Sequence, residues 1–178
     1  AFIFARFEFP GRDIIFYGFL LILFVPGTIL LVPTFQLIVQ LKLHNTLWAL
    51  ILPYTAHQSL IIFVLRSFFA ELPTEMFDAA KVDGASEWQI FSRIVLPLMR
   101  PALATVAIFN MIKIWNDFWF PLVFIRSEES RTVALGVSLL FGQYRTDWTR
   151  ALAVLSLAAV PLLILYVLLA REFIKGLT

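Results

Sequence analysis

The chain is 178 residues long, with 61% hydrophobic residues, only 15% charged residues and a formal net charge of +2. An ordinary soluble domain carries about 25% charged residues, so this composition argues against a soluble globule and indicates a surface that largely faces lipid. Because the Lys and Arg residues are few and scattered, nucleic-acid binding has no support, and the lack of Cys excludes disulfides and thiolate metal sites.

Four apolar stretches predict an all-α fold, a polytopic transmembrane helical bundle. Each is long enough to cross about 30 Å of hydrocarbon as a helix. The first, second and fourth stretches contain no Asp, Glu, Lys or Arg, whereas Lys113 and Asp117 interrupt the third. The predicted spans are residues 14–41, 43–65, 101–125 and 151–170, within one transmembrane domain over residues 1–178.

The connections between these spans predict their orientation. Four spans place the entry segment, the connection after the second span and the C-terminal tail on one side, with eight Lys and Arg residues. The opposite side carries five. By the positive-inside rule, the first group is expected in the cytoplasm.

The connection over residues 66–100 predicts two short helices joined by a turn. Pro73 fits the first turn of a helix, and Gly84 is placed to end that helix in a left-handed conformation. Ser86, followed three residues later by Gln89, is a capping-box pattern that predicts a second helix. In that helix, Trp88, Phe91, Val95 and Leu98 are expected on one apolar side. From the residues alone, this connection could also be an amphipathic helix lying in the lipid headgroups.

The same connection carries a motif with fixed spacing over 20 residues. It resembles the cytoplasmic loop of the permease subunits of ABC importers, usually written with Glu-Ala-Ala, Gly and Ile-x-Leu-Pro. One position departs, because Asp78 stands where the family has Glu, which keeps the charge but shortens its reach. The motif residues are Asp78, Ala79, Ala80, Gly84, Ile94, Leu96 and Pro97.

Further segments look like the carbohydrate-uptake branch of that family, the maltose-transporter type. Family members have six spans, which implies that this chain is a fragment with two spans preceding the four predicted here. The segments that carry this likeness are Ala5–Phe7, Pro10–Arg12, Leu65–Phe69, Asp83–Ser86, Trp115–Phe118 and Gly176–Thr178.

The resemblance implies a sugar permease subunit of the inner membrane. It would work with two ATP-binding subunits, a second permease subunit and an extracytoplasmic solute-binding protein, which Tyr144, Asp147 and Trp148 could contact. The 71–100 segment would form a cytoplasmic coupling loop that fits a cleft of the ATPase. Small Ala79 and Ala80 would allow close approach, and Asp78 would face a basic partner. The chain itself has no G-x-x-x-x-G-K-[ST] phosphate loop, so ATP hydrolysis is expected in a partner.

Polar residues in the third span have two interpretations. A lone Lys at the centre of a membrane helix costs about 2.5 to 3.5 kcal/mol on insertion scales, so this side of the helix should face the bundle interior. The residues could line the sugar path, with Trp115 offering a ring face to a sugar. Alternatively, Lys113 and Asp117 could form a neutralised pair that, with a hydrogen-bonded Asn110, locks helix to helix. The substrate-path candidates are Asn110, Lys113, Trp115, Asn116 and Asp117.

Two other classes compete with the importer. A membrane-embedded, metal-dependent transferase needs two carboxylates on one helix face, whereas Asp78 and Asp83 lie five residues apart and do not converge on an ideal helix. A structural membrane subunit is compatible with the composition. His44 and His57 are isolated in sequence, so we expect no metal site, and no cofactor is expected.

Overall fold

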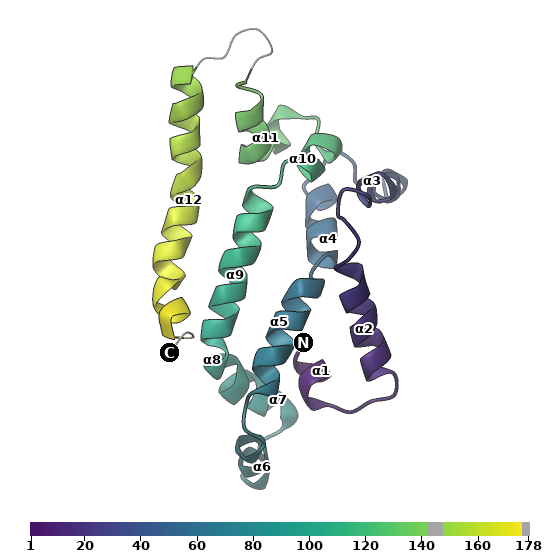
Figure 1. Cartoon of the computed structure of the whole chain (residues 1–178), viewed down its shortest axis with the longest axis vertical. Helices are drawn as coiled ribbons and strands as arrows, with labels where there is room; N and C mark the ends of the chain where they lie inside the picture. Colours follow the sequence, from purple (N-terminus) through teal and green to yellow (C-terminus); the bar gives the residue numbers. More distant parts are fainter. Residues whose placement is uncertain (142–147, 176–178) are drawn as a thin grey trace. The chain divides into compact units, whose positions relative to one another are not determined.

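The structure is a computed structural model that describes residues 1–141 and 148–175, and for residues 171–175 the backbone only. The regular elements in this part of the chain are all helical (Figure 1). The predicted all-α class is therefore confirmed.

The described residues form two compact units. The first contains residues 1–23, residues 59–108 and the C-terminal end of the chain from Leu168. The second contains residues 24–58 and 109–167. Each unit has its own cluster of buried apolar side chains.

The first unit builds its core around a helical hairpin. Helices α1, α2 and α5 contact one another (Figure 1), and the hairpin follows α5 along the chain. The buried residues of this core are Phe69, Phe77, Ala80, Ile90, Val95, Met99 and Ala102. The elements are α1 (Phe2–Arg6), α2 (Arg12–Ile22), α5 (Ser59–Ala70), α6 (Thr74–Val82), α7 (Glu87–Ile90), the π-helix η1 (Phe91–Val95), α8 (Leu96–Leu98) and the first part of α9 (Arg100–Trp115).

The second unit packs α10 against α3 and α4. Asn45 fastens this packing, because its side-chain oxygen accepts hydrogen bonds from the backbone N–H groups of Arg126 and Ser127, both at 2.8 Å. The buried residues are Ile38, Ala49, Leu50, Phe124 and Ile125. The elements are α3 (Leu31–Gln40), α4 (Trp48–Ala56), the end of α9, α10 (Trp119–Phe124), the 3-10 helix η2 (Glu128–Ser130), α11 (Val133–Ser138) and most of α12 (Trp148–Lys175).

Three of the four stretches expected as continuous helices are interrupted. The 14–41 stretch divides into α2 and α3, because Pro26-Gly27 lies between them and both residues disfavour a continuing helix. The 43–65 stretch breaks after α4, where the Gln58 side-chain amide donates to the Tyr54 carbonyl. In a continuous helix the backbone N–H of Gln58 would use that carbonyl.

The 101–125 stretch breaks between α9 and α10. There the carboxylate of Asp117 accepts a hydrogen bond from the backbone N–H of Trp119 at 3.0 Å, a local bond that competes with the helical pattern. Only the fourth stretch, residues 151–170, lies within one uninterrupted helix, α12.

By length and apolar composition, one helical segment of the described chain, Trp148–Ala170, is sufficient to cross a membrane. Two bent pairs would bring this number to three if each pair formed one span: α4 with α5, and the Glu87–Leu98 segment with α9. Helix α3 is apolar but shorter. The four predicted spans therefore stay a prediction.

Candidate functional site

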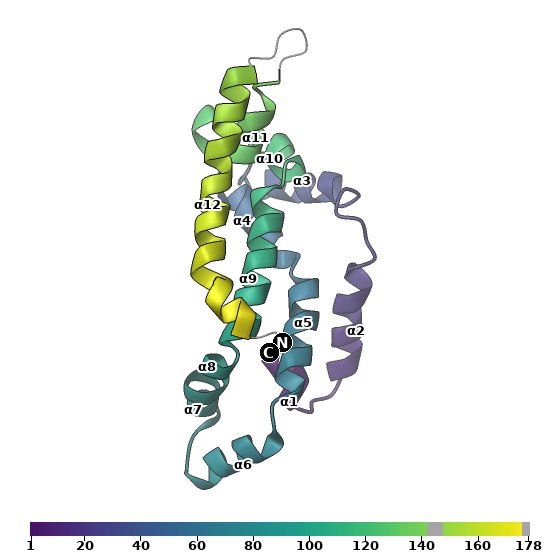
Figure 2. The same cartoon turned by 60° about the vertical axis from the view of Figure 1, so that its left-hand side comes forward.

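The motif residues lie on a helical hairpin formed by α6, a tight turn and α7 (Figures 1 and 2). Helix α6 ends with two hydrogen bonds: the N–H of Ala85 donates to the carbonyl of Ala80 at 2.9 Å, and the N–H of Gly84 donates to that of Lys81 at 3.0 Å. This pair of bonds is a Schellman motif. Gly84 has φ of 81°, which confirms the predicted left-handed conformation.

The second helix begins as the sequence predicts. The Ser86 hydroxyl accepts from the backbone N–H of Gln89 at 3.3 Å, and the Gln89 side chain accepts from the N–H of Ser86 at 2.8 Å. An ion pair also crosses the turn, with 2.8 Å between Lys81 Nζ and Glu87 Oε1. By hydrogen bonding and by its charge, Glu87 raises the pKa of Lys81. The turn is thus fixed by five local interactions: the two hydrogen bonds that end α6, the two of the capping box and this ion pair.

Helix α6 has one face buried in the core and one exposed face. Phe77 and Ala80 are only 8% and 7% exposed. The opposite face presents Glu75, Asp78, Ala79 and Val82, which are all exposed and follow the i, i+3, i+4, i+7 spacing of one helix side. The two alanines, predicted to act together in close approach, therefore have separate roles. Ala80 packs inside the hairpin, and only Ala79 lies on this face, which we call the outward face of α6.

The apolar side predicted for the second helix is partly wrong. Ile90 and Val95 are fully buried, whereas Trp88 is 72% exposed and Leu98 52% exposed. The prediction assumed one regular α-helix, but residues 91–95 form a π-helix, which changes the register of the side chains. Pro97 follows directly and has no N–H to donate to the preceding turn.

The last three motif residues differ in how accessible they are to a partner. Ile94 is half-buried and packs against the hairpin core, while Leu96 is half-buried and Pro97 is exposed. Their position after the hairpin indicates that they shape its junction with α9. On geometry, the outward face of α6 is the part of the motif that is open to a partner.

Arg6 was missed as a site residue by sequence reasoning. Its guanidinium donates to the Leu72 carbonyl, just before α6, and lies 4.1 Å above the centre of the Phe77 ring. The contact joins residues 66 positions apart, so no local spacing could reveal it. Arg6 thus ties α1 to the base of the hairpin.

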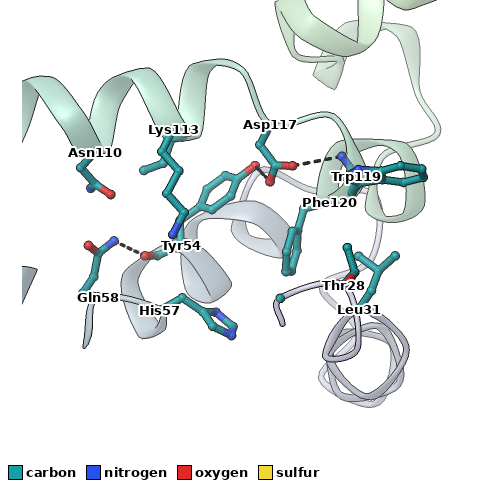
Figure 3. Close-up of a pocket in the computed structure, with 12 residues that line it drawn as sticks. Thr28, Leu31, Tyr54, His57, Gln58, Asn110, Lys113, Asp117, Trp119 and Phe120 are labelled. Atoms are coloured by element: carbon teal, nitrogen blue, oxygen red, sulfur yellow. Dashed lines mark hydrogen bonds between the residues drawn. The ribbon is translucent and has the colours of Figure 1, made fainter. Parts of the chain in front are cut away.

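A cavity of about 270 Å³ lies within the second unit. Figure 3 shows Asn110 and Lys113 projecting from α9 toward the residues at the end of α4, with Phe120 of α10 beside them. The apolar walls include Leu31, Ile114 and Trp119. The polar lining of the cavity consists of Thr28, Tyr54, His57, Gln58, Asn110, Lys113 and Asp117.

Asp117 is held by two hydrogen bonds. The Tyr54 hydroxyl donates to one carboxylate oxygen at 2.8 Å, and the N–H of Trp119 donates to the other at 3.0 Å (Figure 3). Lys113 forms no ion pair in the part of the chain that the structure describes. The pair of Lys113 with Asp117, one of the two predicted alternatives, is therefore absent from this geometry.

The five predicted substrate-path residues divide into two groups. Asn110, Lys113 and Asp117 line the cavity. Trp115 instead donates from its indole N–H to the Ala158 carbonyl of α12 at 3.1 Å, and the Asn116 amide donates to the Ile112 carbonyl at 2.8 Å. Both fasten the end of α9. The sequence analysis missed Tyr54, His57 and Gln58, because their element contributes to the cavity only through the tertiary fold.

The remaining predictions concern residues 144, 147 and 148, the C-terminal segment and the expected lack of a metal site. Residues 144, 147 and 176–178 lie outside the described residues, while Trp148 begins α12 and is 65% exposed. Within the described ranges, no three His, Cys, Asp or Glu side chains are grouped so that they could hold a metal ion.

The described residues thus form an all-helical fold with apolar helices, a capped hairpin and a polar cavity between helices. The family model described as "Binding-protein-dependent transport system inner membrane component" matches residues 1–176. The chain therefore belongs to this family, which confirms the resemblance found in the sequence.

Several characterised relatives are transport permeases. The chain is 40% identical to the arabinooligosaccharides transport system permease protein AraQ of Halalkalibacterium halodurans, over 98% of this chain and 62% of the relative. It is 36% identical to the diacetylchitobiose uptake system permease protein NgcG of Streptomyces coelicolor, over 97% and 58%. It is 32% identical to the sn-glycerol-3-phosphate transport system permease protein UgpE of Salmonella typhi, over 99% and 63%. The chain thus spans about three-fifths of the length of these relatives.

A solved structure shares the fold. It belongs to a bacterial ABC transporter involved in the import of the acidic polysaccharide alginate, and it superimposes with a TM-score of 0.81 at 19% identity, covering 97% of this chain and 65% of that one. The fold is therefore that of an ABC importer permease.

Proposed function

We propose that the chain is part of a permease subunit that carries a sugar across the cell membrane, driven by ATP hydrolysis on a separate subunit. Family membership and the sugar-transport relatives support this function. The observation that carries it is the hairpin, which combines the family's motif with a fixed turn and an open face. Two ATP-binding subunits, a second permease subunit and an extracytoplasmic solute-binding protein complete the transporter.

The outward face of α6 docks into a cleft of the ATP-binding subunit on the cytoplasmic side. Asp78 offers its carboxylate to a basic partner, and the small Ala79 lets the two backbones approach closely. Val82, which is 88% exposed, adds apolar surface that a partner can cover. Because the turn is tightly hydrogen-bonded, movement of the ATP-binding subunits passes to the membrane helices as rigid-body motion.

A bulky residue at Ala79 tests this docking. In the full-length transporter, Ala79→Trp should lower ATP-driven sugar uptake into membrane vesicles at least about 10-fold, because a ring in the contact prevents close approach. Ala79→Ser keeps the side chain small and should retain uptake. Since Ala79 is exposed in this chain, both variants should insert into the membrane normally. Normal uptake by the Trp variant would contradict the docking.

The cavity of the second unit forms part of the sugar path. Asn110, Lys113 and Asp117 line it, together with Tyr54 and Gln58, and its walls combine apolar surface with a few polar groups, as is typical of ligand sites. Trp115 and Asn116 position the end of α9 rather than contact sugar.

Copurification separates the importer function from the two competing functions, because neither a transferase nor a structural subunit predicts an associated ATPase.

A further inference from the structure

We infer that the cavity of the second unit binds a negatively charged carbohydrate, one that carries a carboxylate or a phosphate, and that Lys113 recognises the charge. This inference rests on the proposed function and names the substrate class of the same site. In the cavity lining, the charged group of Asp117 has hydrogen-bond partners, whereas that of Lys113 has none among the described residues.

The negative group of the cavity already has its partners. Both oxygens of Asp117 accept hydrogen bonds, one from the Tyr54 hydroxyl and one from the N–H of Trp119. These bonds join three different segments of the second unit, so they hold the carboxylate in place. Asp117 is thereby a structural acid, oriented toward Tyr54 and Trp119.

The positive group of the cavity has no ionic or hydrogen-bonding partner among the residues that the structure describes. Lys113 is exposed toward the cavity and makes no ion pair or hydrogen bond among the described residues. An ammonium group in a membrane-embedded site is strongly disfavoured unless it has an anionic or polar partner. Lysine also binds carboxylates and phosphates as a point charge. An anionic ligand supplies the partner that the described residues do not.

The remaining polar groups suit the hydroxyl groups of a sugar. The Gln58 side-chain oxygen is buried without a hydrogen-bond partner, while its amide nitrogen donates to the Tyr54 carbonyl. A hydroxyl group can donate to that free oxygen. Asn110 adds a further amide on the α9 side, and Phe120 adds a ring face (Figure 3). One cation, unsatisfied amide groups and aromatic surface together match an acidic sugar better than a neutral one.

The experiment compares pairs of sugars in which one member carries an acidic group at C6 and the other does not. The complete transporter, with its binding protein and ATP-binding subunits, is reconstituted in vesicles, and uptake is measured for digalacturonate against galactobiose and for glucose 6-phosphate against glucose. We expect at least one charged sugar to be imported with an efficiency at least about 10-fold above that of its neutral counterpart, as one charge-assisted contact would give. The two arms distinguish a carboxylate from a phosphate.

Substitution of Lys113 assigns the effect to this cavity. Lys113→Gln should abolish the preference for the charged sugar, and Lys113→Arg should restore much of it. Lys42→Gln removes the same charge from a residue outside the cavity lining and should keep the preference. Preference for neutral sugars, import of neither charged sugar, or an unchanged preference in Lys113→Gln would overturn the inference.

These outcomes are distinct from failure of the proposed function. A transporter that retains its ATP-binding subunits and imports only neutral sugars contradicts the charge inference alone. A complex that imports no sugar of any kind and does not associate with an ATPase contradicts the proposed function.

Discussion

At the scale of single residues, the account depends on side chains whose conformation or hydrogen bonding has no easy substitute. Gly84 adopts a left-handed conformation, yet nothing lies within 4 Å of the position that a Cβ atom would take. The requirement for glycine there is therefore conformational rather than a matter of space.

Gly84→Ala should destabilise the hairpin by about 1 to 2 kcal/mol, the usual cost of a left-handed conformation for an L-residue. Gly84→Asn should cost less, because asparagine tolerates this conformation. The measurement is the thermal unfolding midpoint of the purified transporter, together with retention of the ATP-binding subunits. Equal midpoints for the Ala variant and the wild type would contradict the role assigned to the turn.

Tyr54 and Asp117 form the second residue-scale feature. Tyr54→Phe removes the hydroxyl that donates to the carboxylate, so it should destabilise the second unit by about 1 to 3 kcal/mol. Tyr17→Phe is the matched control, because Tyr17 is 61% exposed and its hydroxyl makes no hydrogen bond in the described structure. If thermal unfolding shows the same small change for both variants, the Tyr54 hydroxyl does not support the cavity.

At the scale of elements, α1 acts as a brace for the hairpin through Arg6. This arginine contacts the Leu72 carbonyl and the Phe77 ring, and Arg66 of α5 donates to the Phe4 carbonyl at 3.3 Å. Two arginines therefore join α1 to the elements that carry the hairpin. Loss of Arg6 should loosen the packing of α6 on its core.

Thiol labelling measures this packing. Ala80→Cys places a small reactive group at a position that is 7% exposed, so it should react slowly with a maleimide. Addition of Arg6→Ala should raise the labelling rate about 10-fold, since local opening exposes the thiol. Arg12→Ala is the control, because Arg12 pairs with its neighbour Asp13 away from the hairpin. An unchanged rate in the Arg6 variant would show that α1 does not brace α6.

Among the elements, the hairpin and the long C-terminal helix could be predicted from the sequence, whereas two helix breaks could not. The hairpin was predictable because its signals, Gly84 and the Ser86–Gln89 pair, act over three or four residues. The uninterrupted helix over residues 151–170 was predictable from composition. The breaks near Gln58 and Asp117 were not, because they arise from side chains that bind backbone groups, which apolar windows cannot detect.

The residues of the candidate site could likewise be predicted only in part from the sequence. Asn110, Lys113 and Asp117 were found because polar groups are conspicuous in an apolar stretch. Tyr54 reaches Asp117 across 63 positions, so their contact depends on the fold of the second unit. For the same reason, sequence spacing could not show that Ala79 faces outward while Ala80 is buried.

In the molecule as a whole, we propose that the hairpin receives mechanical work from a cytoplasmic ATPase and passes it to the membrane helices. The sequence of this chain contains no G-x-x-x-x-G-K-[ST] phosphate loop. The outward face of α6 combines exposed acidic, small and apolar side chains on one fixed helix. It is the surface on which this contact is proposed.

Cross-linking tests this claim most directly. In the full-length transporter without other cysteines, Ala79→Cys is treated with a short cross-linker that carries a maleimide at one end and a photoreactive group at the other. Val133→Cys, 43% exposed on α11, serves as the control. The account predicts a covalent adduct between position 79 and the ATP-binding subunit, with none from position 133. An intact complex that yields no adduct at position 79, or yields equal adducts at both positions, would contradict it.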